Sequence, residues 1–266
     1  MWCDLIPGEG DTQLMVTQAR HEGVKVFRSG EQWEEVASFN ITHTGFCRGY
    51  IECDQDLGDG DHLMVTPSGQ SGLLVSKLVL PHIRPIVTLE REGSGSVMSV
   101  ARGPASTPAR LMAGYEAGEI VLWDWSNNLA LMEVSLAPHL GTLMALTWDL
   151  DRGRMAAVGS EARLVVVDTE AMKVTRVREV TNPGLGAVMV RGDGRILVTG
   201  GWDARLRVFS WGASPDKAKP LAVLQFHTES VETLLTCDNL EEGRLAGRRL
   251  ILAGGKDGKI SFWDIY

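Results

Sequence analysis

An acidic stretch in the first third of the chain has the residue type and close spacing of a metal-binding loop. It contains Asp54, Asp56, Asp59 and Asp61, and carboxylate oxygens are the ligands that calcium prefers. A calcium loop of the EF-hand type would also need a carboxylate at its twelfth position, which is Val65 here, and a helix on each side. We therefore interpret the stretch as a solvated acidic loop and expect no metal site.

Nucleophilic and cofactor-binding motifs are equally incomplete. Ser94 lies between glycines in Gly93-Ser94-Gly95-Ser96, but the segment lacks the G-x-S-x-G pattern and the strand-to-helix elbow of a hydrolase. Neither a phosphate-binding P-loop motif nor a dinucleotide fingerprint occurs, and the six histidines lie in separate segments. We expect a protein with no catalytic residues and no cofactor.

Cysteine placement, net charge and hydropathy argue against further classes of protein. The cysteines are scattered, without C-x-x-C pairs or nearby histidines, which is typical of reduced thiols: Cys3, Cys47, Cys53 and Cys237. The net charge of −8 argues against direct nucleic-acid binding, because that requires a surplus of Lys and Arg. No apolar run approaches the roughly 20 residues of a membrane span, so no membrane partner is expected.

A repeated β-hairpin pattern organises the chain. The clearest copy is LILAGGKDGKISFWDIY at 250–266, in which two apolar runs flank a Lys-Asp-Gly turn. The other copies align with its Trp263 at Phe27, Trp123, Val167 and Phe209, and these five anchor positions are spaced by 96, 44, 42 and 54 residues. Periods of 40 to 45 residues with β-branched strands and glycine turns predict propeller blades.

The spacing of 96 must hold two repeats, so a degenerate blade is expected between residues 40 and 90. We assign its four strands to 46–48, 63–65, 73–75 and 86–88, and treat residues 212–219 and 238–249 as loops inserted in the last repeats. The predicted fold is all-β, a single propeller with blades at about 1–40, 41–91, 92–135, 136–179, 180–226 and 227–266.

The repeats resemble WD-repeat propellers along the whole chain. That resemblance implies a buried hydrogen-bonded network of His, Asp, Trp and Ser or Thr in each blade, for which the candidates here are His139, His227, Asp203, Asp257, Trp123 and Trp263. The final repeat has no Ser or Thr in residues 250–256, and other repeats lack the His or the Trp. We expect no blade to carry the complete network.

A narrower resemblance rests on LMAGYEAGEIVLWD, on Thr-Asn-Pro-Gly at 181–184, on Gly-Trp-Asp at 201–203 and on Gly-Phe-Cys-Arg-Gly at 45–49. With these motifs the chain is similar to the guanine nucleotide-binding protein subunit beta-like protein 1 family, whose fungal members are called ASTRA-associated protein 1. The resemblance implies a non-enzymatic scaffold of the ASTRA complex. It also implies roles in chromatin regulation and in co-chaperone-assisted maturation of phosphatidylinositol-3-kinase-related kinases, in the nucleus and also the cytoplasm.

Against that family, the chain looks shorter by one blade. Residues 1–5 fit an inner strand, and the last repeat ends just after its third strand. We therefore expect about six blades of seven, an incompletely closed ring, and an unpaired strand edge beside residues 260–263.

One set of turn positions is a candidate partner-binding face. Trp202 precedes the turn Asp of its repeat, and the same place is taken elsewhere by Arg20, Glu116, Ser160 and Lys256. An exposed aromatic there would be a binding hot spot, whereas the alternative is a Trp packed under a neighbouring loop.

Other functions remain open at this stage. A different WD-repeat adaptor, such as a G-protein β-like signalling scaffold or a ubiquitin-ligase substrate receptor, would share the fold. The Trp-Asp-x-Arg sequence at 202–205 is not placed at the end of a third strand, where the docking box of such receptors belongs. An enzyme using the central channel would need His or carboxylates on the inner strands, which are apolar at Val97, Leu143, Val188 and Val231.

Overall fold

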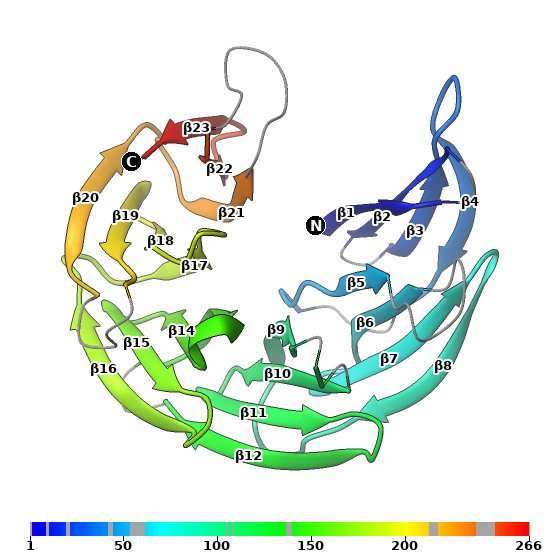
Figure 1. Ribbon diagram of the computed structural model, residues 1–266, viewed down its shortest axis with the longest axis horizontal. Helices are drawn as coiled ribbons and strands as arrows, with labels where there is room; N and C mark the ends of the chain where they lie inside the picture. The colour runs from blue at the N-terminus through cyan, green and yellow to red at the C-terminus, as the bar shows by residue number, and fades with distance from the viewer. Residues whose placement is uncertain are drawn as a thin grey trace. The chain divides into compact units, whose positions relative to one another are not determined.

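A computed structural model of the chain describes residues 2–8, 11–19, 22–41, 45–53, 62–104, 106–107, 109–136, 140–212, 218–237 and 248–265. Within these residues the regular structure is almost entirely β-strand, arranged as consecutive antiparallel sheets in which strands follow one another in chain order (Figure 1). There are six such sheets, and each is the blade unit of a propeller. The predicted all-β propeller class is confirmed.

The chain divides into two compact units, one of residues 1–116 and 121–132 and the other of residues 117–120 and 133–266. The first unit contains blades one to three, apart from residues 119–120 of the third strand and 133–135 of the fourth strand of blade three. Their strands are β1 (Trp2–Pro7), β2 (Gln13–Ala19), β3 (Gly23–Arg28), β4 (Glu34–Phe39), β5 (Tyr50–Cys53), β6 (His62–Ser68), β7 (Gly72–Val79), β8 (His82–Leu89), β9 (Val97–Arg102), β10 (Arg110–Tyr115), β11 (Glu119–Asp124) and β12 (Leu129–Ser135).

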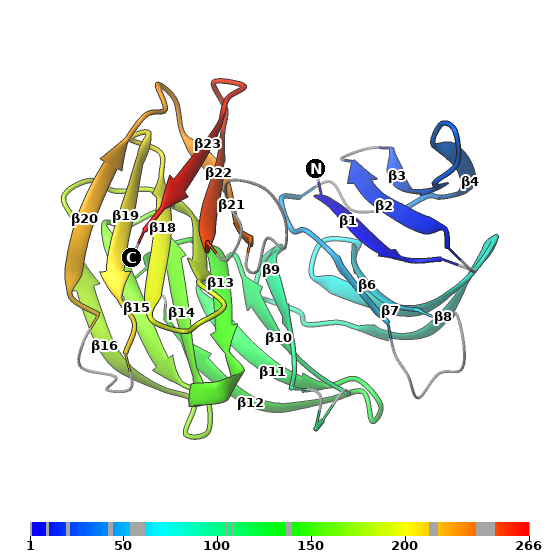
Figure 2. The ribbon, with the colours of Figure 1, turned by 45° about the horizontal axis from the view of Figure 1, so that its top comes forward.

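The second unit contains blades four to six, in which β18, β19 and β20 run side by side (Figure 2). Its strands are β13 (Leu143–Asp149), β14 (Arg154–Gly159), β15 (Arg163–Asp168), β16 (Lys173–Glu179), β17 (Leu185–Val190), β18 (Ile196–Gly201), β19 (Arg205–Ser210), β20 (Pro220–Gln225), β21 (Val231–Cys237), β22 (Leu250–Gly255) and β23 (Ile260–Asp264). A 3-10 turn, η2 (Leu150–Arg152), follows β13.

The hairpin predicted at the end of the chain is confirmed as β22 and β23. The two strands pair in register, with Ile251 opposite Trp263, and Gly258 closes the turn at a φ of 73° that favours glycine. Within the described residues the sixth sheet has the order β21-β22-β23, so β23 pairs only with β22 there. Ile260 and Phe262 on that strand are 64% and 63% exposed.

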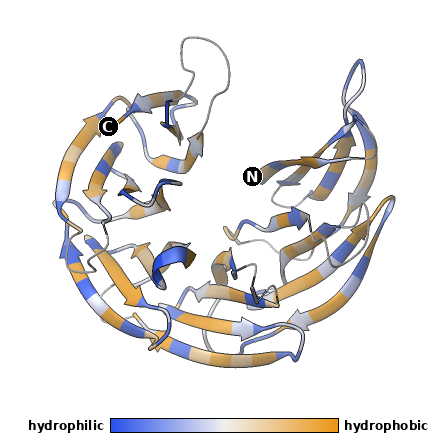
Figure 3. Cartoon of the chain, in the orientation of Figure 1, coloured by the Kyte–Doolittle hydropathy of each residue, from blue (hydrophilic) through white to orange (hydrophobic). Residues whose placement is uncertain are grey.

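Apolar side chains from facing sheets form the cores, and Figure 3 shows the hydrophobic residues concentrated along the strands. In the second unit, one core joins blades four and five through Val158, Leu197 and Phe209. A second core joins blades five and six through Val208 and Ile251. Burying sheet faces against one another is what holds consecutive blades together.

The burial pattern of a blade's second strand shows whether one or both faces of its sheet are covered. β6 and β18 are buried along nearly their whole length, because they have another sheet on each face within their unit. β2 and β22 instead alternate between buried and partly exposed residues. This alternation is the pattern of a sheet with one covered face.

The degenerate second blade departs from its prediction at one strand. The expected segments 63–65, 73–75 and 86–88 lie within β6, β7 and β8, but the first strand is β5 at Tyr50–Cys53 rather than 46–48. The reason is a side chain of the first blade. Gln18 donates from Nε2 to the carbonyl of Cys47 over 3.2 Å and accepts from the N–H of Gly49 over 2.8 Å, so its amide satisfies the backbone in place of a partner strand.

The same segment buries a thiol. Cys47 is almost fully buried, and that burial raises the pKa of its thiol to about 12, so the side chain acts as a small apolar core residue. Cys3, Cys47 and Cys237 are free, as the sequence predicts.

We predict that Gln18→Met lowers the free energy of unfolding by roughly 2 kcal/mol, because it leaves a buried N–H and a buried carbonyl unpaired. Urea unfolding followed by fluorescence measures the loss. Gln13→Met, on the same strand but exposed, is the matched control and should be close to neutral. Equal stability of the two variants would contradict this role for Gln18.

Candidate protein-interaction site

The sixth blade contains a four-membered buried polar network. His227 lies with Nδ1 3.1 Å from Oδ1 of Asp257 and with Nε2 3.0 Å from Oγ of Ser261. The indole N–H of Trp263 donates to the same Oγ over 2.8 Å. The network ties the segment before β21 to the β22–β23 turn and to β23, so it fixes the geometry of one end of the blade.

This network corrects one sequence-based expectation. We looked for the hydroxyl group within residues 250–256 and found none, whereas Ser261 on β23 supplies it. Ser261 is two residues before Trp263 on one strand, so both side chains point to the same face. In β22, Gly255 leaves the room needed, since a Cβ there would lie 2.5 Å from Nδ1 of His227.

The carboxylate of this network is strongly stabilised. The hydrogen bond from the N–H of Thr228 is the main reason that the pKa of Asp257 lies well below its ordinary value. Burial acts in the opposite direction, while His227 and the N–H of Lys259 lower the pKa further. Asp257 therefore stays ionised through the physiological range and holds the loop before β21 against the turn.

In the fifth blade an arginine, rather than a histidine and a serine, holds the turn Asp in place. Arg207 takes the place on β19 that Ser261 has on β23, four residues after the turn Asp. Its Nη1 and Nη2 donate to the two oxygens of Asp203 over 3.0 and 2.6 Å, and Nη2 also reaches Oγ1 of Thr181 at 3.5 Å. Burial raises the pKa of Asp203, but the hydrogen bonds and charge of Arg207 outweigh it and leave that pKa lowered.

The other predicted network residues have different surroundings. Trp123 is buried and donates its indole N–H to the hydroxyl of Tyr115 over 3.2 Å, so a tyrosine replaces the His and Ser pair in the third blade. Val167, at the Trp place of the fourth blade, is fully buried. His139 lies outside the described residues.

The candidate partner-binding positions share one backbone geometry. Each of the four positions that the structure describes directly follows the second strand of its blade and donates its N–H to the carbonyl of the residue just before the first strand, across 2.8 to 2.9 Å. The pairs are Glu116 to Ser96, Ser160 to Thr142, Trp202 to Gly184 and Lys256 to Ser230. We call the turns between second and third strands the BC turns. Arg20, the fifth candidate, lies outside the described residues.

In the second unit the BC turns of neighbouring blades are connected. The N–H of Gly184 donates to the carbonyl of Ser160 over 3.0 Å, and its carbonyl accepts from Trp202. Ser160 turns its hydroxyl inward, because Oγ accepts from the N–H of Thr142 over 3.1 Å. The side chain of Trp202 is instead 47% exposed.

The indole ring of Trp202 packs against the backbone of Gly184. A Cβ on Gly184 would lie 2.1 Å from Cε3 of Trp202, and Gly184 also has a φ of 81°. Only glycine fits beneath the ring, so one face of the indole is packed and the other meets solvent. The structure thus shows the ring packed on Gly184 and partly exposed, and a role of Trp202 as a binding hot spot stays a prediction.

The turn that carries Trp202 is conformationally strained. Ala204 has a φ of 65° at the place where Gly118 and Gly258, with φ of 82° and 73°, stand in other blades. A residue with a Cβ costs about 1 to 2 kcal/mol in this region. Such strain is characteristic of positions with a functional constraint.

Three residues that matter to this edge escaped the sequence analysis: Ser261, Arg207 and Gly184. The period-two spacing of Ser261 from Trp263, and of Arg207 from Phe209, is the signal that could have located the first two. Among the described residues no group of His, Cys, Asp and Glu could hold a metal ion. The described part of the chain also contains no helix with the length and hydropathy of a membrane span.

We predict that the stability difference between the wild type and Asp257→Asn narrows in acid. The lowered pKa makes the contribution of Asp257 complete above its ordinary value of 3.8, and that contribution is lost as the pH falls toward the folded-state value. Urea unfolding of both proteins from pH 7 to pH 3 measures the gap. The Asp203–Arg207 pair is present in both proteins, so its own acid sensitivity cancels, and a constant gap would contradict the prediction.

We also predict that Gly184→Ala lowers the free energy of unfolding by about 2 kcal/mol or more, because positive φ and a clash with the indole add together. Gly93→Ala is the matched control, since Gly93 has a φ of 83° but open space around it. The difference between the two variants measures the contact with Trp202. Equal losses would show that the ring does not depend on Gly184.

Comparison with known proteins places the chain in a family. A profile described as WD domain, G-beta repeat, matches residues 218–264, which include the sixth blade. The solved structure of Saccharomyces cerevisiae Sqt1 superposes with a TM-score of 0.73 over 99% of this chain and 71% of that one. At 14% identity this likeness concerns the fold alone.

Two kinds of relative share closer sequence similarity. Guanine nucleotide-binding protein subunit beta-like protein 1 of Mus musculus is 32% identical over 239 residues, which cover 86% of this chain and 67% of the mouse protein. ASTRA-associated protein 1 of Schizosaccharomyces japonicus is 30% identical over 190 residues, covering 66% of this chain and 49% of that protein. The protein of the same name from Verticillium alfalfae is 26% identical over 246 residues, covering 78% and 60%.

The chain thus spans about half to two thirds of the length of these relatives, and none of their names denotes an enzyme. The mouse protein is matched over most of this chain, and the WD-repeat profile falls on the blade with the full polar network. The chain belongs to the guanine nucleotide-binding protein subunit beta-like protein 1 family of WD-repeat proteins.

Proposed function

We propose that this chain is a non-enzymatic interaction scaffold of the ASTRA assembly, acting in the nucleus and also in the cytoplasm. The printed name of its fungal relatives, ASTRA-associated protein 1, supports the choice of assembly. The proposal extends to chromatin regulation and to co-chaperone-assisted maturation of phosphatidylinositol-3-kinase-related kinases, which the resemblance of the sequence implies. The partners are protein subunits of that complex.

The observation that carries the proposal is the half-exposed indole of Trp202 on a rigid support. Gly184 packs under the ring, and the ion pair between Asp203 and Arg207 fixes the BC turn that carries Trp202. A large aromatic side chain already held in one orientation loses little entropy on binding, which is why Trp is enriched among hot spots. Ser160 and Lys256 occupy the equivalent places in the neighbouring blades and would lie at the rim of the same surface.

Backbone strain in the same turn supports this assignment. Ala204 keeps a left-handed conformation where glycine would be cheaper, and the strained turn is the one that presents Trp202. A stability cost at this position is accounted for if the geometry of the turn serves binding.

We predict that Trp202→Ala weakens capture of the complex by roughly 2 kcal/mol or more, about 30-fold in Kd, while leaving the fold intact. Tagged wild-type and variant proteins are expressed in cells, and co-purified subunits are quantified by mass spectrometry. Trp33→Ala is the matched control, because Trp33 is similarly exposed at 44% but lies outside the BC turns. Unchanged capture with Trp202→Ala would refute the proposed surface.

The same experiment decides between this role and a different WD-repeat adaptor. Recovery of G-protein or ubiquitin-ligase subunits in place of ASTRA and co-chaperone subunits would favour the alternative. The Trp202–Arg205 segment does not favour the ligase receptor, because Arg205 is the first residue of the third strand, β19, 4.0 Å from Asp203, rather than a residue at the end of that strand.

A further inference from the structure

The fourth strand of each of the first five blades is an outer strand. It pairs with the third strand of its blade and with no other strand among the described residues. The second edge of such a strand presents backbone groups that can pair with a strand of another chain, and proteins commonly prevent this with charged side chains or proline. The composition of an outer strand therefore indicates whether its edge can accept a partner.

The outer strand of blade five, β20, contains no charged side chain. Its sequence is Pro-Leu-Ala-Val-Leu-Gln, with proline at the first position only. The other outer strands all carry charges: Glu34 and Glu35 in β4, Arg84 beside Pro85 in β8, Glu133 in β12, and Lys173, Arg176, Arg178 and Glu179 in β16. β20 thus lacks the side chains that oppose edge-to-edge pairing in the other four blades.

Apolar side chains of β20 are exposed at alternate positions. Leu221 and Val223 are 57% and 52% exposed, whereas Ala222 and Leu224 pack against the core that joins blades five and six. Phe226, directly after the strand, is 51% exposed. One set of side chains therefore fixes the strand to the blade, and the other set remains available for contact.

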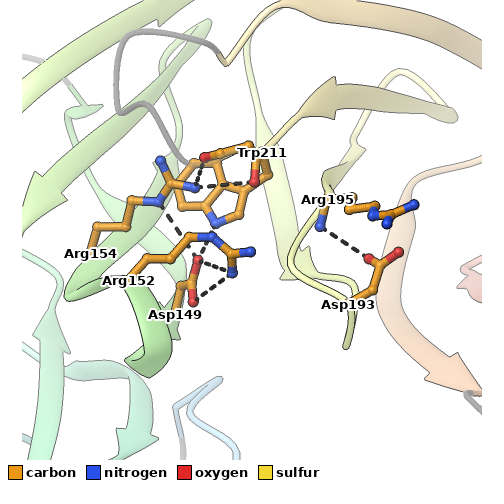
Figure 4. Close-up of polar contacts among 7 residues, drawn as sticks. Asp149, Arg152, Arg154, Asp193, Arg195 and Trp211 are labelled. Atoms are coloured by element: carbon orange, nitrogen blue, oxygen red, sulfur yellow. Dashed lines mark hydrogen bonds and ion pairs between the residues drawn. The ribbon is translucent and has the colours of Figure 1, made fainter.

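Blade four holds the chain where it leaves β19 (Figure 4). Nη2 of Arg154 donates to the carbonyls of Trp211 and Gly212 over 3.1 and 2.6 Å, and Cζ of the same guanidinium lies 4.0 Å from the centroid of the Trp211 ring. The indole N–H of Trp211 donates to Oδ2 of Asp149 over 2.6 Å. The connection from β19 to β20 therefore starts from a fixed position.

The chain is also held where it enters β20. Nε of Arg178 on β16 donates to the carbonyl of Ala218 over 3.0 Å. The N–H of Ser210 donates to the carbonyl of Lys219 over 2.8 Å, and the N–H of Lys219 donates to Oγ of Ser210 over 3.1 Å. An extended strand that is fixed before a partner arrives loses little entropy when the partner binds.

Cations lie near both ends of this apolar edge. Lys219 is exposed directly before β20, and Nζ of Lys259 lies 5.9 Å from the centroid of the Phe226 ring. Residues 218–228 include no Asp or Glu. Antiparallel pairing of β20 with β20 of a second copy would bring the end with Lys219 beside the end with Lys259, so like charges would meet. The charges therefore favour a different partner, with carboxylates at the ends of its strand.

We propose that the edge of β20 binds an extended segment of a partner protein as an added strand, apolar at alternate positions and acidic at both ends. Backbone hydrogen bonds give such a complex its affinity, and contacts with alternate side chains give it specificity. Leu221 is the extra residue of a bulge against β19, so the regular part of the edge is residues 222–225. The proposal rests neither on Trp202 nor on the identity of the assembly.

A peptide of defined sequence tests this site. The probe is Asp-Glu-Val-Thr-Val-Thr-Val-Glu-Asp with fluorescein at its N-terminus, and its anisotropy is followed against the whole chain. We expect saturable binding that falls at least tenfold in Val223→Glu, because a charge then lies on the edge. A peptide with Lys at the four acidic positions should bind at least tenfold more weakly than the probe. Amide hydrogen exchange should slow in β20 on binding and stay unchanged in β8.

Ile86→Glu is the matched control. Ile86 is also β-branched and is 45% exposed on the outer strand β8, where Arg84 and Pro85 already oppose pairing. This variant should keep an affinity within about twofold of wild type. If Val223→Glu lowers the melting temperature by more than a few degrees, Val223→Thr, which keeps the β-branched shape, replaces it with the same expected direction.

Three results of the peptide experiment overturn the proposal: no saturable binding, equal loss in Val223→Glu and Ile86→Glu, or equal affinity for the probe and the lysine peptide. Dimerisation of the chain that Val223→Glu abolishes also overturns it, because a second copy would then occupy the edge. Sedimentation of the wild type and Val223→Glu at several concentrations measures that dimerisation.

Discussion

Everything in this protein depends on burying the faces of small antiparallel sheets against one another. The described residues contain almost no helix, so the sheets themselves supply both sides of each core. A sheet with neighbours on both faces must be apolar on both, which is why β18 is buried along its whole length. A sheet with one covered face alternates instead, as β22 does. Packing therefore decides the residue pattern strand by strand.

Sheet-on-sheet packing leaves the strand ends to be fixed by other means, and this protein uses several. The sixth blade joins His227, Asp257, Ser261 and Trp263, the fifth pairs Arg207 with Asp203, and the third sets Tyr115 against Trp123. In each of these three networks the polar side chains find partners inside their own blade. Because only satisfaction is required, one blade can use a histidine where its neighbour uses an arginine.

Because these networks fix the strand ends, the turns there are suitable positions for binding residues. Strand residues are committed to cores, whereas the turns at the two ends of the strands are held in place but are free to vary in sequence. In the second unit one end carries Trp202 on a glycine support, and the other carries guanidinium groups held by Asp149 and Asp193. The side chains at the two ends therefore differ in chemistry, one aromatic and the others charged.

The sequence by itself determined the repeating hairpins and hence the propeller class, because period-two apolar runs and Asp-Gly turns are local signals. It also identified His227, Asp257 and Trp263, whose types and spacing recur in the resemblance to WD-repeat proteins. It misplaced the first strand of the second blade, since the backbone at Cys47 and Gly49 is satisfied by Gln18 from another sheet.

Only the tertiary structure decided which side chains complete the polar network of each blade. Contacts between distant segments decided that Ser261 supplies the missing hydroxyl, that Arg207 replaces a histidine, and that Arg249 of the sixth blade pairs with Asp193 of the fifth. The exposure of Trp202 was equally undetermined, because it depends on Gly184 lying under one face of the ring. Hydrophobic periodicity can be recognised from residues that are close in the sequence. Polar pairing and exposure depend instead on which distant segments pack together.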